Sequence, residues 1–303
     1  MPANQHNTTQ PSPDVLNFYR DNGPMTADAT HAALYGALPD DIPSLARVMH
    51  GLLLHQHIAP AYGQTLSGER LAEPHIRSVR RMLDQLLAHD SSALTTARSP
   101  DKRLVGVCRH FTTLFVTALR ARGYAARARC GFGAYFEADK FVDHWVCEYW
   151  NAAQSRWILV DAQVDEVQRG LFKIDFDLLD VPRDRFVIAG EAWRQCREGG
   201  QDPGRFGIMQ MNGLWFVAGN VLRDFAALNN VEMLPWDVWG PMFRPGDTAD
   251  AEQLALFDRL AALTQSPDAS FAELRELYEQ GPDLKVPPTV FNAVLNRPEA
   301  VAV

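Results

Sequence analysis

The sequence predicts an α+β protein in which a buried helix packs on an antiparallel sheet, with helical regions before and after this core. Two observations support this fold class. Apolar residues recur at helical spacing through residues 26–98 and again from 250 to 280, whereas aromatic and β-branched residues concentrate in extended segments between 124 and 161. One strongly apolar helix follows Pro100, directly before the extended segments. The change of period along the chain therefore separates the core from its flanks.

The length and composition allow either one large domain or two. The chain has 303 residues, of which 47% are hydrophobic, enough for a sizeable buried core. We divide it into a polar leader predicted to be disordered (1–13), an N-terminal helical region (14–99), the core (100–190), and an aromatic-rich, helical C-terminal region packed on the core (191–303). The C-terminal helices are expected at 250–264 and 269–280.

The charge and cysteine content argue against several classes of protein. A formal net charge of −8 provides no positive field to attract nucleic acid. No segment has the roughly 20 apolar residues that span a bilayer, and no secretory pattern begins the chain, so we expect a cytoplasmic protein with no membrane partner. The 4 cysteines form no CxxC pair, which argues against structural zinc and a disulfide scaffold. We therefore expect neither a metal nor another cofactor.

Helical spacing in the N-terminal region is clearest shortly before residue 90. It runs through the apolar residues Ile76, Val79, Met82, Leu83, Leu86 and Leu87. His55 and His57 are spaced like a metal-binding pair, but residues two apart share a face only on a strand. Because this region is predicted to be helical, we favour no metal site there.

A cysteine stands at the predicted start of the buried helix of the core. Five apolar side chains follow it at helical spacing: Phe111, Leu114, Phe115, Ala118 and Leu119. Gly123 stands in the position of a C-terminal cap, which leaves Cys108 in the first turn. There, free N–H groups and the helix dipole would favour a thiolate and could stabilise an oxyanion. Taken alone, Cys108 is more commonly a small buried apolar side chain.

A hairpin places a histidine and an aspartate on one face of the predicted sheet. Residues 143–150 and 156–161 alternate as strands, with a turn-prone segment between them. If the turn is centred between Ala152 and Ala153, His144 lies directly opposite Asp161, close enough for the carboxylate to hold the imidazole in one tautomer. Each residue alone has a common structural explanation, as a core histidine or a turn aspartate. Together with Cys108 they match the arrangement of an activated nucleophile.

Three short motifs resemble the transglutaminase-like superfamily. They are GVCRHF from Gly106, DHWV from Asp143, and RWILVD ending at Asp161, in the same chain order of Cys, His and Asp. The resemblance covers roughly residues 100–165 and implies a papain-like fold, in which the cysteine heads a helix packed on the sheet that carries the histidine and aspartate. A bacterial cytosolic member of the superfamily is expected. The resemblance implies that Cys108, His144 and Asp161 are catalytic.

The resemblance leaves the reaction open. The superfamily contains amide-crosslinking enzymes, peptidases, peptide N-glycanases and inactive binding relatives. We expect Cys108 to attack an amide or thioester carbonyl of a small molecule or peptide, with hydrolysis slightly favoured. The alternatives are an amide-forming acyltransferase in a small-molecule pathway, with a carrier-protein-bound acyl donor as one option, and a non-catalytic binding protein on the same fold.

Substrate contacts are predicted less sharply than the catalytic residues. Arg109, Trp145, Gln163 and Trp215 are the candidates. For Arg109, the alternative is pairing with an acidic neighbour. For the tryptophan-rich stretch that includes Trp215, the favoured interpretation is a hydrophobic core. Asp143 could tune His144, but an exposed residue at the start of a strand is the simpler expectation.

Overall fold

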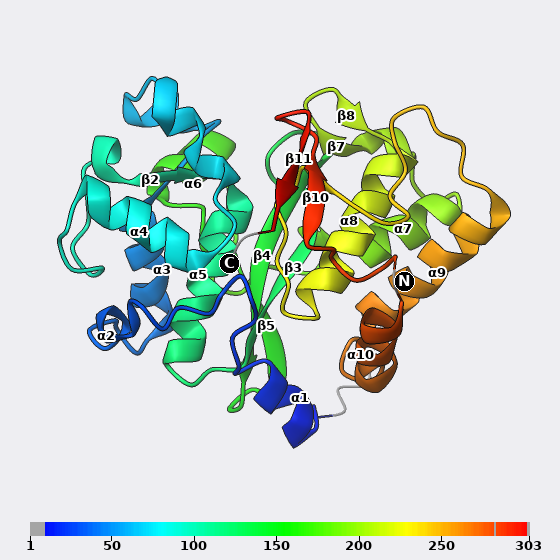
Figure 1. Cartoon of the computed structure of the whole chain (residues 1–303), viewed down its shortest axis with the longest axis horizontal. Coiled ribbons are helices and arrows are strands. Elements are labelled where there is room, and N and C mark those ends of the chain that lie inside the picture. The colour runs from blue at the N-terminus through cyan, green and yellow to red at the C-terminus, as the bar shows by residue number, and fades with distance from the viewer. Residues whose placement is uncertain (1–9, 282, 302–303) are drawn as a thin grey trace.

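The computed structural model describes residues 10–281 and 283–301 and has an α+β fold, which confirms the predicted fold class. A mixed sheet runs through the centre of the molecule, with α2 to α6 on one side of it and α7 to α10 on the other (Figure 1). Its strands follow the order β6-β3-β4-β7-β8, and β5 pairs with β4. They are β3 (Ala126–Gly133), β4 (Phe141–Asn151), β5 (Arg156–Val160), β6 (Phe186–Ile188), β7 (Phe206–Ile208) and β8 (Met211–Asn212).

The buried helix forms where the apolar spacing predicts it. Helix α5 (Cys108–Ala121) packs on β3 and β4 and is buried from its first residue to Arg120. Gly123 follows with φ +82°, a left-handed conformation that costs glycine little and ends the helix. One strand pair departs from the antiparallel expectation, because β7 runs parallel to β4.

The N-terminal region mixes helices with two short strands. Its helices are α1 (Pro13–Phe18), α2 (Ala32–Tyr35), α3 (Ile42–Leu52) and α4 (Val79–His89), and 3-10 turns lie at Ala59–Tyr62, Gly68–Leu71, Glu73–His75 and Pro100–Lys102. Strand β1 (Leu53–His55) pairs parallel with β2 (Leu104–Gly106), which leads into α5. The prediction that residues around His55 are helical is therefore wrong, because these residues complete a strand pair with a segment about fifty positions away.

The predicted leader is described only in part. Residues 1–9 lie outside the described residues. The hydroxyl of Ser12 accepts a hydrogen bond from the N–H of Val15 at 3.3 Å and caps α1, which begins at Pro13. Pro at the first helical position and an N-cap serine are the usual signals of a helix start.

Helix α6 (Glu166–Phe172) follows β5 and lies on the same side of the sheet as α5. The other side of β3 is covered by α7 (Ala189–Arg197), a 3-10 turn at Pro203–Arg205, α8 (Leu214–Ala227), α9 (Ala251–Gln265) and α10 (Phe271–Gln280), and the same part of the chain contains β9 (Asp237–Val238), β10 (Thr289–Asn292) and β11 (Arg297–Ala300). Helices α9 and α10 confirm the two helices expected from residue 250 onward. The tryptophans at 193 and 239 are buried in the core of this region.

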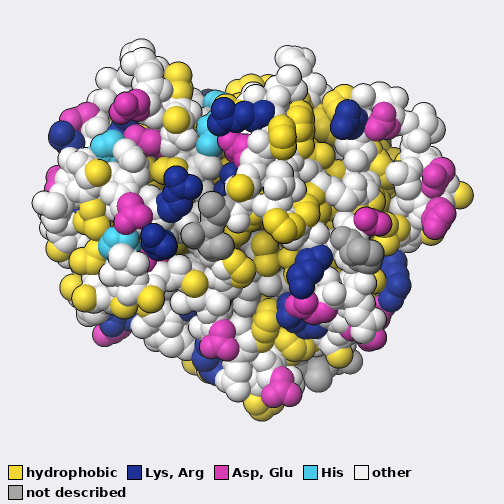
Figure 2. All heavy atoms as spheres, viewed as in Figure 1, with side chains coloured by type: hydrophobic (Ala, Val, Ile, Leu, Met, Phe, Trp, Pro, Cys, Tyr) yellow, Lys and Arg dark blue, Asp and Glu magenta, His cyan; other side chains and the backbone are white. Residues whose placement is uncertain are grey.

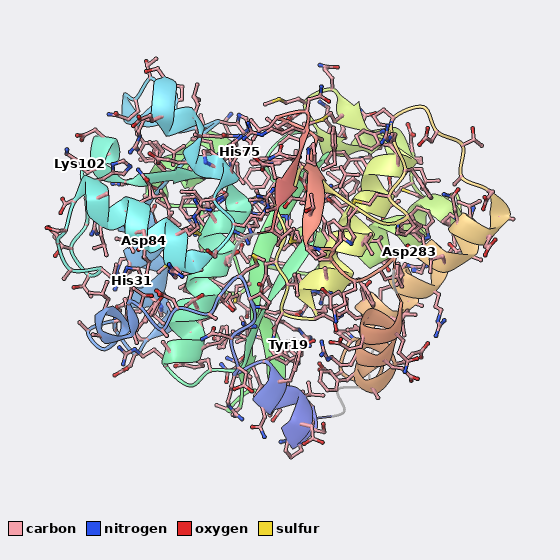
Figure 3. The ribbon with its side chains drawn as sticks, in the orientation of Figure 1. Tyr19, His31, His75, Asp84, Lys102 and Asp283 are labelled. Atoms are coloured by element: carbon pink, nitrogen blue, oxygen red, sulfur yellow. The ribbon has the colours of Figure 1, made fainter. Side chains whose placement is uncertain are left out.

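Polar contacts join the two flanking regions across the core. Arg77 donates to both carboxylate oxygens of Asp237 at 2.9 and 2.6 Å and to Glu299 at 3.0 Å. Nearby, Asn292 of β10 donates to His75 at 3.0 Å, and Figure 3 shows His75 beside the C-terminal hairpin. The segment that precedes α4 is thus fixed to the last strands of the chain.

The surface carries both signs of charge. On the face drawn in Figure 2, basic, acidic and hydrophobic side chains are interspersed. Among the helices that the structure describes, none combines the length and apolar character needed to cross a bilayer.

Candidate active site

The start of α5 is held by a histidine in its first turn. The N–H of Val107 donates to Nδ1 of His110 at 3.2 Å, and Nε2 of His110 lies 3.0 Å from the carbonyl oxygen of Ile76. These two contacts require an Nε2–H tautomer. Burial, followed by the charge of Arg109, lowers the pKa of His110 to about 3, so the ring stays neutral and can accept from Val107. His110 therefore fixes the turn on which Cys108 stands.

The thiol of Cys108 lies against strand β4. The residue is 6% exposed, and the backbone N–H groups of Trp145 and Arg109 donate to its sulfur. Burial, with the nearby carboxylate of Asp143, raises the pKa of the thiol well above its usual value despite these donors. The expectation that the helix start favours a resting thiolate is therefore corrected, because the loss of solvation outweighs the N–H groups.

His144 and Asp161 form a direct buried pair. Nε2 of His144 lies 2.9 Å from Oδ2 of Asp161, and the two residues are 2% and 1% exposed. The hydroxyl of Tyr135 donates to the same carboxylate oxygen at 2.7 Å, and the N–H of Gln163 donates to the other oxygen at 3.0 Å. Burial raises the pKa of Asp161, but His144, Tyr135 and the Gln163 N–H lower it more, so the net pKa lies below its usual value. The carboxylate is thus held ionised against the imidazole.

The hairpin that brings this pair together has a different register from the predicted one. Asn151 pairs with Arg156 and Cys147 with Val160, which would place Gln163, not Asp161, directly opposite His144. The difference is two residues, so the faces are unchanged and Asp161 reaches His144 diagonally. The turn moves because Ser155 adopts a left-handed φ of +49° and the side chain of Asn151 accepts from the N–H of Gln154.

The thiol of Cys108 lies beside β4 at the residue next to His144, and no hydrogen bond joins the thiol to the imidazole. The sulfur accepts from the N–H of Trp145, the residue that follows His144, which places it one residue from the imidazole along the strand. Nδ1 of His144 makes no hydrogen bond to any residue that the structure describes. The nitrogen that does not face Asp161 is therefore the one available to exchange a proton.

Aromatic rings enclose the imidazole on several sides. The ring centroids of Phe136, Tyr135 and Phe186 lie 4.8, 5.9 and 6.3 Å from that of His144, all in edge-to-face arrangements. Phe172 of α6 meets Phe136 at 5.0 Å. Such a wall lowers the local dielectric and strengthens the polar contacts inside it.

Two of the four predicted substrate contacts lie elsewhere. Arg109 is fully buried and its guanidinium donates to the carbonyl of Glu232, at 3.1 Å from Nε, so the expectation that it binds substrate is corrected. One position along a helix turns a side chain by about 100°, which carries Arg109 away from the thiol. Trp215 donates to the carbonyl of Asn212 at 2.8 Å and packs against Phe216, and none of its described contacts involves the thiol, His144 or Asp161.

The other two candidates lie beside the site through their main chains. Trp145 donates its backbone N–H to the sulfur, while its indole is buried in the core. The side chain of Gln163 donates to Gln168 at 2.9 Å, and its Oε1 is buried without a partner among the described residues.

Sequence reasoning missed three residues near the site. Tyr135 lies in the Gly-Ala-Tyr-Phe segment that follows β3, where nothing local indicates that it reaches Asp161. Asp143, expected to be exposed, is buried and accepts from Asn220 of α8 at 2.7 Å. The β1–β2 pairing aligns His55 with Gly106, two residues before Cys108. No local signal separates Asp143 from its neighbours, because β4 is buried continuously from residue 143 to 150, and the other two depend on tertiary contacts.

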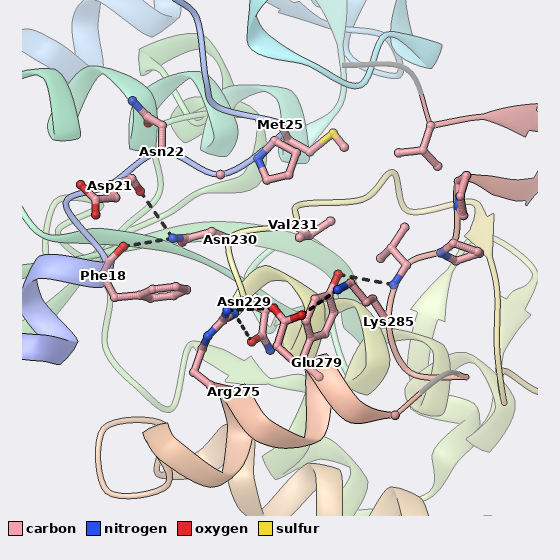
Figure 4. A pocket seen from close by; sticks show the side chains of 18 residues that line it. Phe18, Asp21, Asn22, Met25, Asn229, Asn230, Val231, Arg275, Glu279 and Lys285 are labelled. Carbon is pink, nitrogen blue, oxygen red and sulfur yellow. Dashed lines mark hydrogen bonds and ion pairs between the residues drawn. The ribbon is translucent and has the colours of Figure 1, made fainter.

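No metal ligand set is present in the part of the chain that the structure describes, which contains no cluster of three or more His, Cys, Asp or Glu suited to an ion. A surface cavity formed by residues that the structure describes lies away from the thiol. It has a volume of about 790 Å³ and lies between Phe18, the segment 229–231 and α10 (Figure 4). Its polar groups bond to one another, with Arg275 donating to Asn229 at 2.7 Å and Lys285 to Glu279 at 2.7 Å.

One of three comparisons with known proteins matches the segment that carries the candidate site. Residues 77–162, which include Cys108, His144 and Asp161, match the family model described as the Transglutaminase-like superfamily. The comparison with curated proteins gave no match. A crystal structure described as a "Putative Cysteine Protease from Cytophaga hutchinsonii" aligns with 16% identity and a TM-score of 0.32, covering 58% of this chain and 46% of that chain. The chain thus spans less than half of that protein, and so low a score supports no inference about function.

Proposed function

We propose that this protein transfers an acyl group through a thioester on Cys108, because residues 77–162 match the family model of the transglutaminase-like superfamily, which supports thiol-dependent enzyme chemistry in general. The observation that carries the proposal is the 2.9 Å contact between His144 Nε2 and Asp161 Oδ2. The sulfur of Cys108 lies at the backbone N–H of Trp145, the residue that follows His144 in β4. An activated nucleophile needs a neighbouring base and a third group that orients this base, and the contact would give His144 and Asp161 these two roles.

The proposed reaction begins with a proton transfer. His144 takes the thiol proton at Nδ1, and Asp161 stabilises the resulting imidazolium through Nε2–H. The sulfur lone pair then forms a bond to the carbonyl carbon of an amide or thioester while the carbonyl π electrons move to oxygen. Collapse of this intermediate restores the carbonyl and breaks the bond to the leaving group, which takes the proton from His144. A thioester on Cys108 remains.

The thioester is then resolved by an acceptor. In hydrolysis, which we favour slightly, water gives a proton to His144 and attacks the thioester carbon, releasing a carboxylic acid and the thiol. In the alternative, an amine takes the place of water and the product is an amide. The substrate class proposed is a small-molecule or peptide amide or thioester, including one presented on a carrier protein.

Trapping the acyl group on the cysteine tests this function. The protein is incubated with p-nitrophenyl acetate and its intact mass is measured at early times. We expect an acetyl adduct on the wild type, located on Cys108 by peptide mapping, and none on Cys108→Ala, with Cys196→Ala as a control that keeps the adduct because Cys196 lies outside the site. An adduct of equal yield in Cys108→Ala would contradict the proposal. Adding glycinamide distinguishes the acceptors, since transfer from the enzyme to the amine forms acetylglycinamide faster than the direct reaction of the ester with glycinamide, which is measured with Cys108→Ala.

A further inference from the structure

His55 ends the strand that runs beside the approach to the nucleophile. Strand β1 pairs parallel with β2, and His55 is aligned with Gly106, two residues before Cys108. Side chains of aligned residues on neighbouring strands point to the same face of a sheet. A Cβ on Gly106 would lie 2.8 Å from the Cβ of His110, so that face meets the first turn of α5. His55 therefore lies on the side of the strand pair that faces the turn carrying Cys108, and the space that a Cβ on Gly106 would need is taken by His110.

The imidazole of His55 has hydrogen-bonding capacity that the described residues do not use. Its Nδ1 is buried without a partner, and no hydrogen bond joins either ring nitrogen to another described residue. By contrast, both ring nitrogens of His110, in the first turn of α5, form hydrogen bonds. Because buried polar atoms are almost always paired, a ring in this state is suited to bind a group that arrives from outside the chain.

His55 shares its surroundings with the catalytic candidates. Burial, and then the charges of His57, His144 and His110, lower the pKa of His55 well below its usual value, while Asp161 acts in the opposite direction. The ring is consequently neutral at pH 7, with one N–H donor and one acceptor nitrogen. A neutral imidazole can donate its N–H to a carbonyl oxygen and so polarise the carbonyl group.

We propose that His55 donates a hydrogen bond to the carbonyl oxygen of the substrate as the sulfur of Cys108 adds to the carbonyl carbon. This rests on the proposed function. As the S–C bond forms, the carbonyl π electrons move to the oxygen, and the N–H of His55 stabilises the negative charge together with free N–H groups of the first turn of α5. When the intermediate collapses, the charge returns to the carbonyl and the hydrogen bond weakens. No proton leaves His55 during the step.

Two reactions of the same thiol separate this role from an effect on the thiol itself. Acylation by p-nitrophenyl acetate passes through an oxyanion, whereas alkylation by iodoacetamide displaces iodide at a CH₂ group and forms none. We expect His55→Leu to lower the acylation rate by about 10² to 10³-fold, the usual cost of one lost oxyanion donor, while the alkylation rate of Cys108 changes less than about twofold. His55→Gln, which keeps an N–H donor, should recover most of the loss. His57→Leu is the matched control, because His57 is exposed and lies two residues further along.

Each other outcome overturns the role. Equal losses in acylation and alkylation would mean that His55 supports the thiol or the fold, and an unchanged acylation rate would mean that it does not meet the oxyanion. If the wild type is not acylated on Cys108, whether or not the thiol is alkylated, the proposed function fails first and the role of His55 falls with it, which is a distinct result.

Discussion

Two buried polar networks lie at opposite ends of the β3–β4 strand pair, and they differ in how completely their groups are paired. Near the start of β4, His144 contacts Asp161 and Tyr135 next to the thiol of Cys108, a set that we call the triad network. Four residues further along the same face of β4, Glu148 joins the second network. Its members, which we call the arginine network, are Arg127, Arg129, Arg183, Glu148, Asp224 and Asp268.

In the arginine network, three guanidinium groups face three carboxylates. Arg127 and Arg129 donate to one oxygen of Glu148 at 2.8 and 3.2 Å, and Arg183 reaches its other oxygen at 2.6 Å. Asp224 accepts two hydrogen bonds from Arg129 at 3.0 and 2.8 Å. Although burial raises the pKa of Glu148, the arginines hold it well below its usual value. Charge is balanced inside the network, so it needs no further ligand.

The triad network is left incomplete within the chain. Nδ1 of His144 and both nitrogens of His55 have no partner among the described residues, and the thiol carries its proton in a buried setting. The comparison teaches that burial alone does not distinguish a network proposed to act on a substrate from one that only stabilises the fold. What distinguishes them is whether the hydrogen-bonding capacity of the buried groups is used within the protein.

The largest predicted effect on stability comes from removing a carboxylate from the arginine network. Glu148→Ala should lower the free energy of unfolding by about 3–5 kcal/mol, because it leaves Arg127 and Arg129 buried with too little negative charge. The free energy is measured by urea denaturation at pH 7. In the matched variant at the other end of β4, His144→Ala, the loss should be smaller, while acylation by p-nitrophenyl acetate should be abolished.

Equal losses of stability in the two variants would break the comparison, because the triad network would then also be a structural one. If His144→Ala were still acylated, His144 would not be needed for the reaction, and the triad network would not differ from the arginine network in function.

A second prediction concerns His110, which belongs to the triad end of the sheet but has both nitrogens paired. Its folded-state pKa of about 3 lies below the unfolded value of about 6.5, so between these values only the unfolded state binds the proton. Stability should therefore fall as the pH is lowered from about 6.5, with up to about 1.4 kcal/mol per pH unit from this residue, or about 2 kcal/mol by pH 5. In His110→Gln, the slope of unfolding free energy against pH should decrease by that amount. Identical slopes would show that His110 is protonated in the fold.

The smallest predicted effect concerns Tyr135, whose hydroxyl shares Oδ2 of Asp161 with His144. Tyr135→Phe removes one hydrogen bond, so unfolding should become easier by about 1 kcal/mol at pH 7. The pKa of Asp161 is lowered in the fold, so its contribution is present above the unfolded value of about 3.9 and is lost as the pH falls through the folded pKa. Without the hydroxyl the folded pKa rises toward the unfolded value, so the acid-induced loss of stability from Asp161 should be smaller and should end at a higher pH than in the wild type. Superimposable acid profiles would show that the hydroxyl does not stabilise the carboxylate.

Local patterns were sufficient to predict the parts of the site that each lie on one element. The apolar spacing after Cys108 predicts α5, and the alternation around His144 predicts β4, because the residues that set each period are neighbours along a single element. The register of the hairpin was two residues in error, since it depends on the backbone of Ser155 in the turn rather than on the strands. The facing of His144 and Asp161 survived because an even shift preserves the faces.

Contacts between distant segments could not be predicted in this way. Helix α8 has no apolar stripe, because it is buried on all sides from Phe216 to Ala227, so periodicity gives no boundary. The β1–β2 pair that places His55 joins segments about fifty residues apart, and the hydroxyl of Tyr135 reaches Asp161 across 26 positions. In each case the determining contact is tertiary, and the local residue types are compatible with several structures.

The contact between Arg109 and Glu232 has a consequence for how the protein is made. The guanidinium beside the nucleophile is bonded to a carbonyl 123 positions later in the chain. While the polypeptide grows on the ribosome, the helix that carries Cys108 emerges long before that carbonyl exists, and a buried guanidinium without its acceptor is costly. The nascent chain therefore cannot settle its cysteine into the final position until most of the protein has been translated, and a product truncated before Glu232 would contain the sulfur without the structure that holds it.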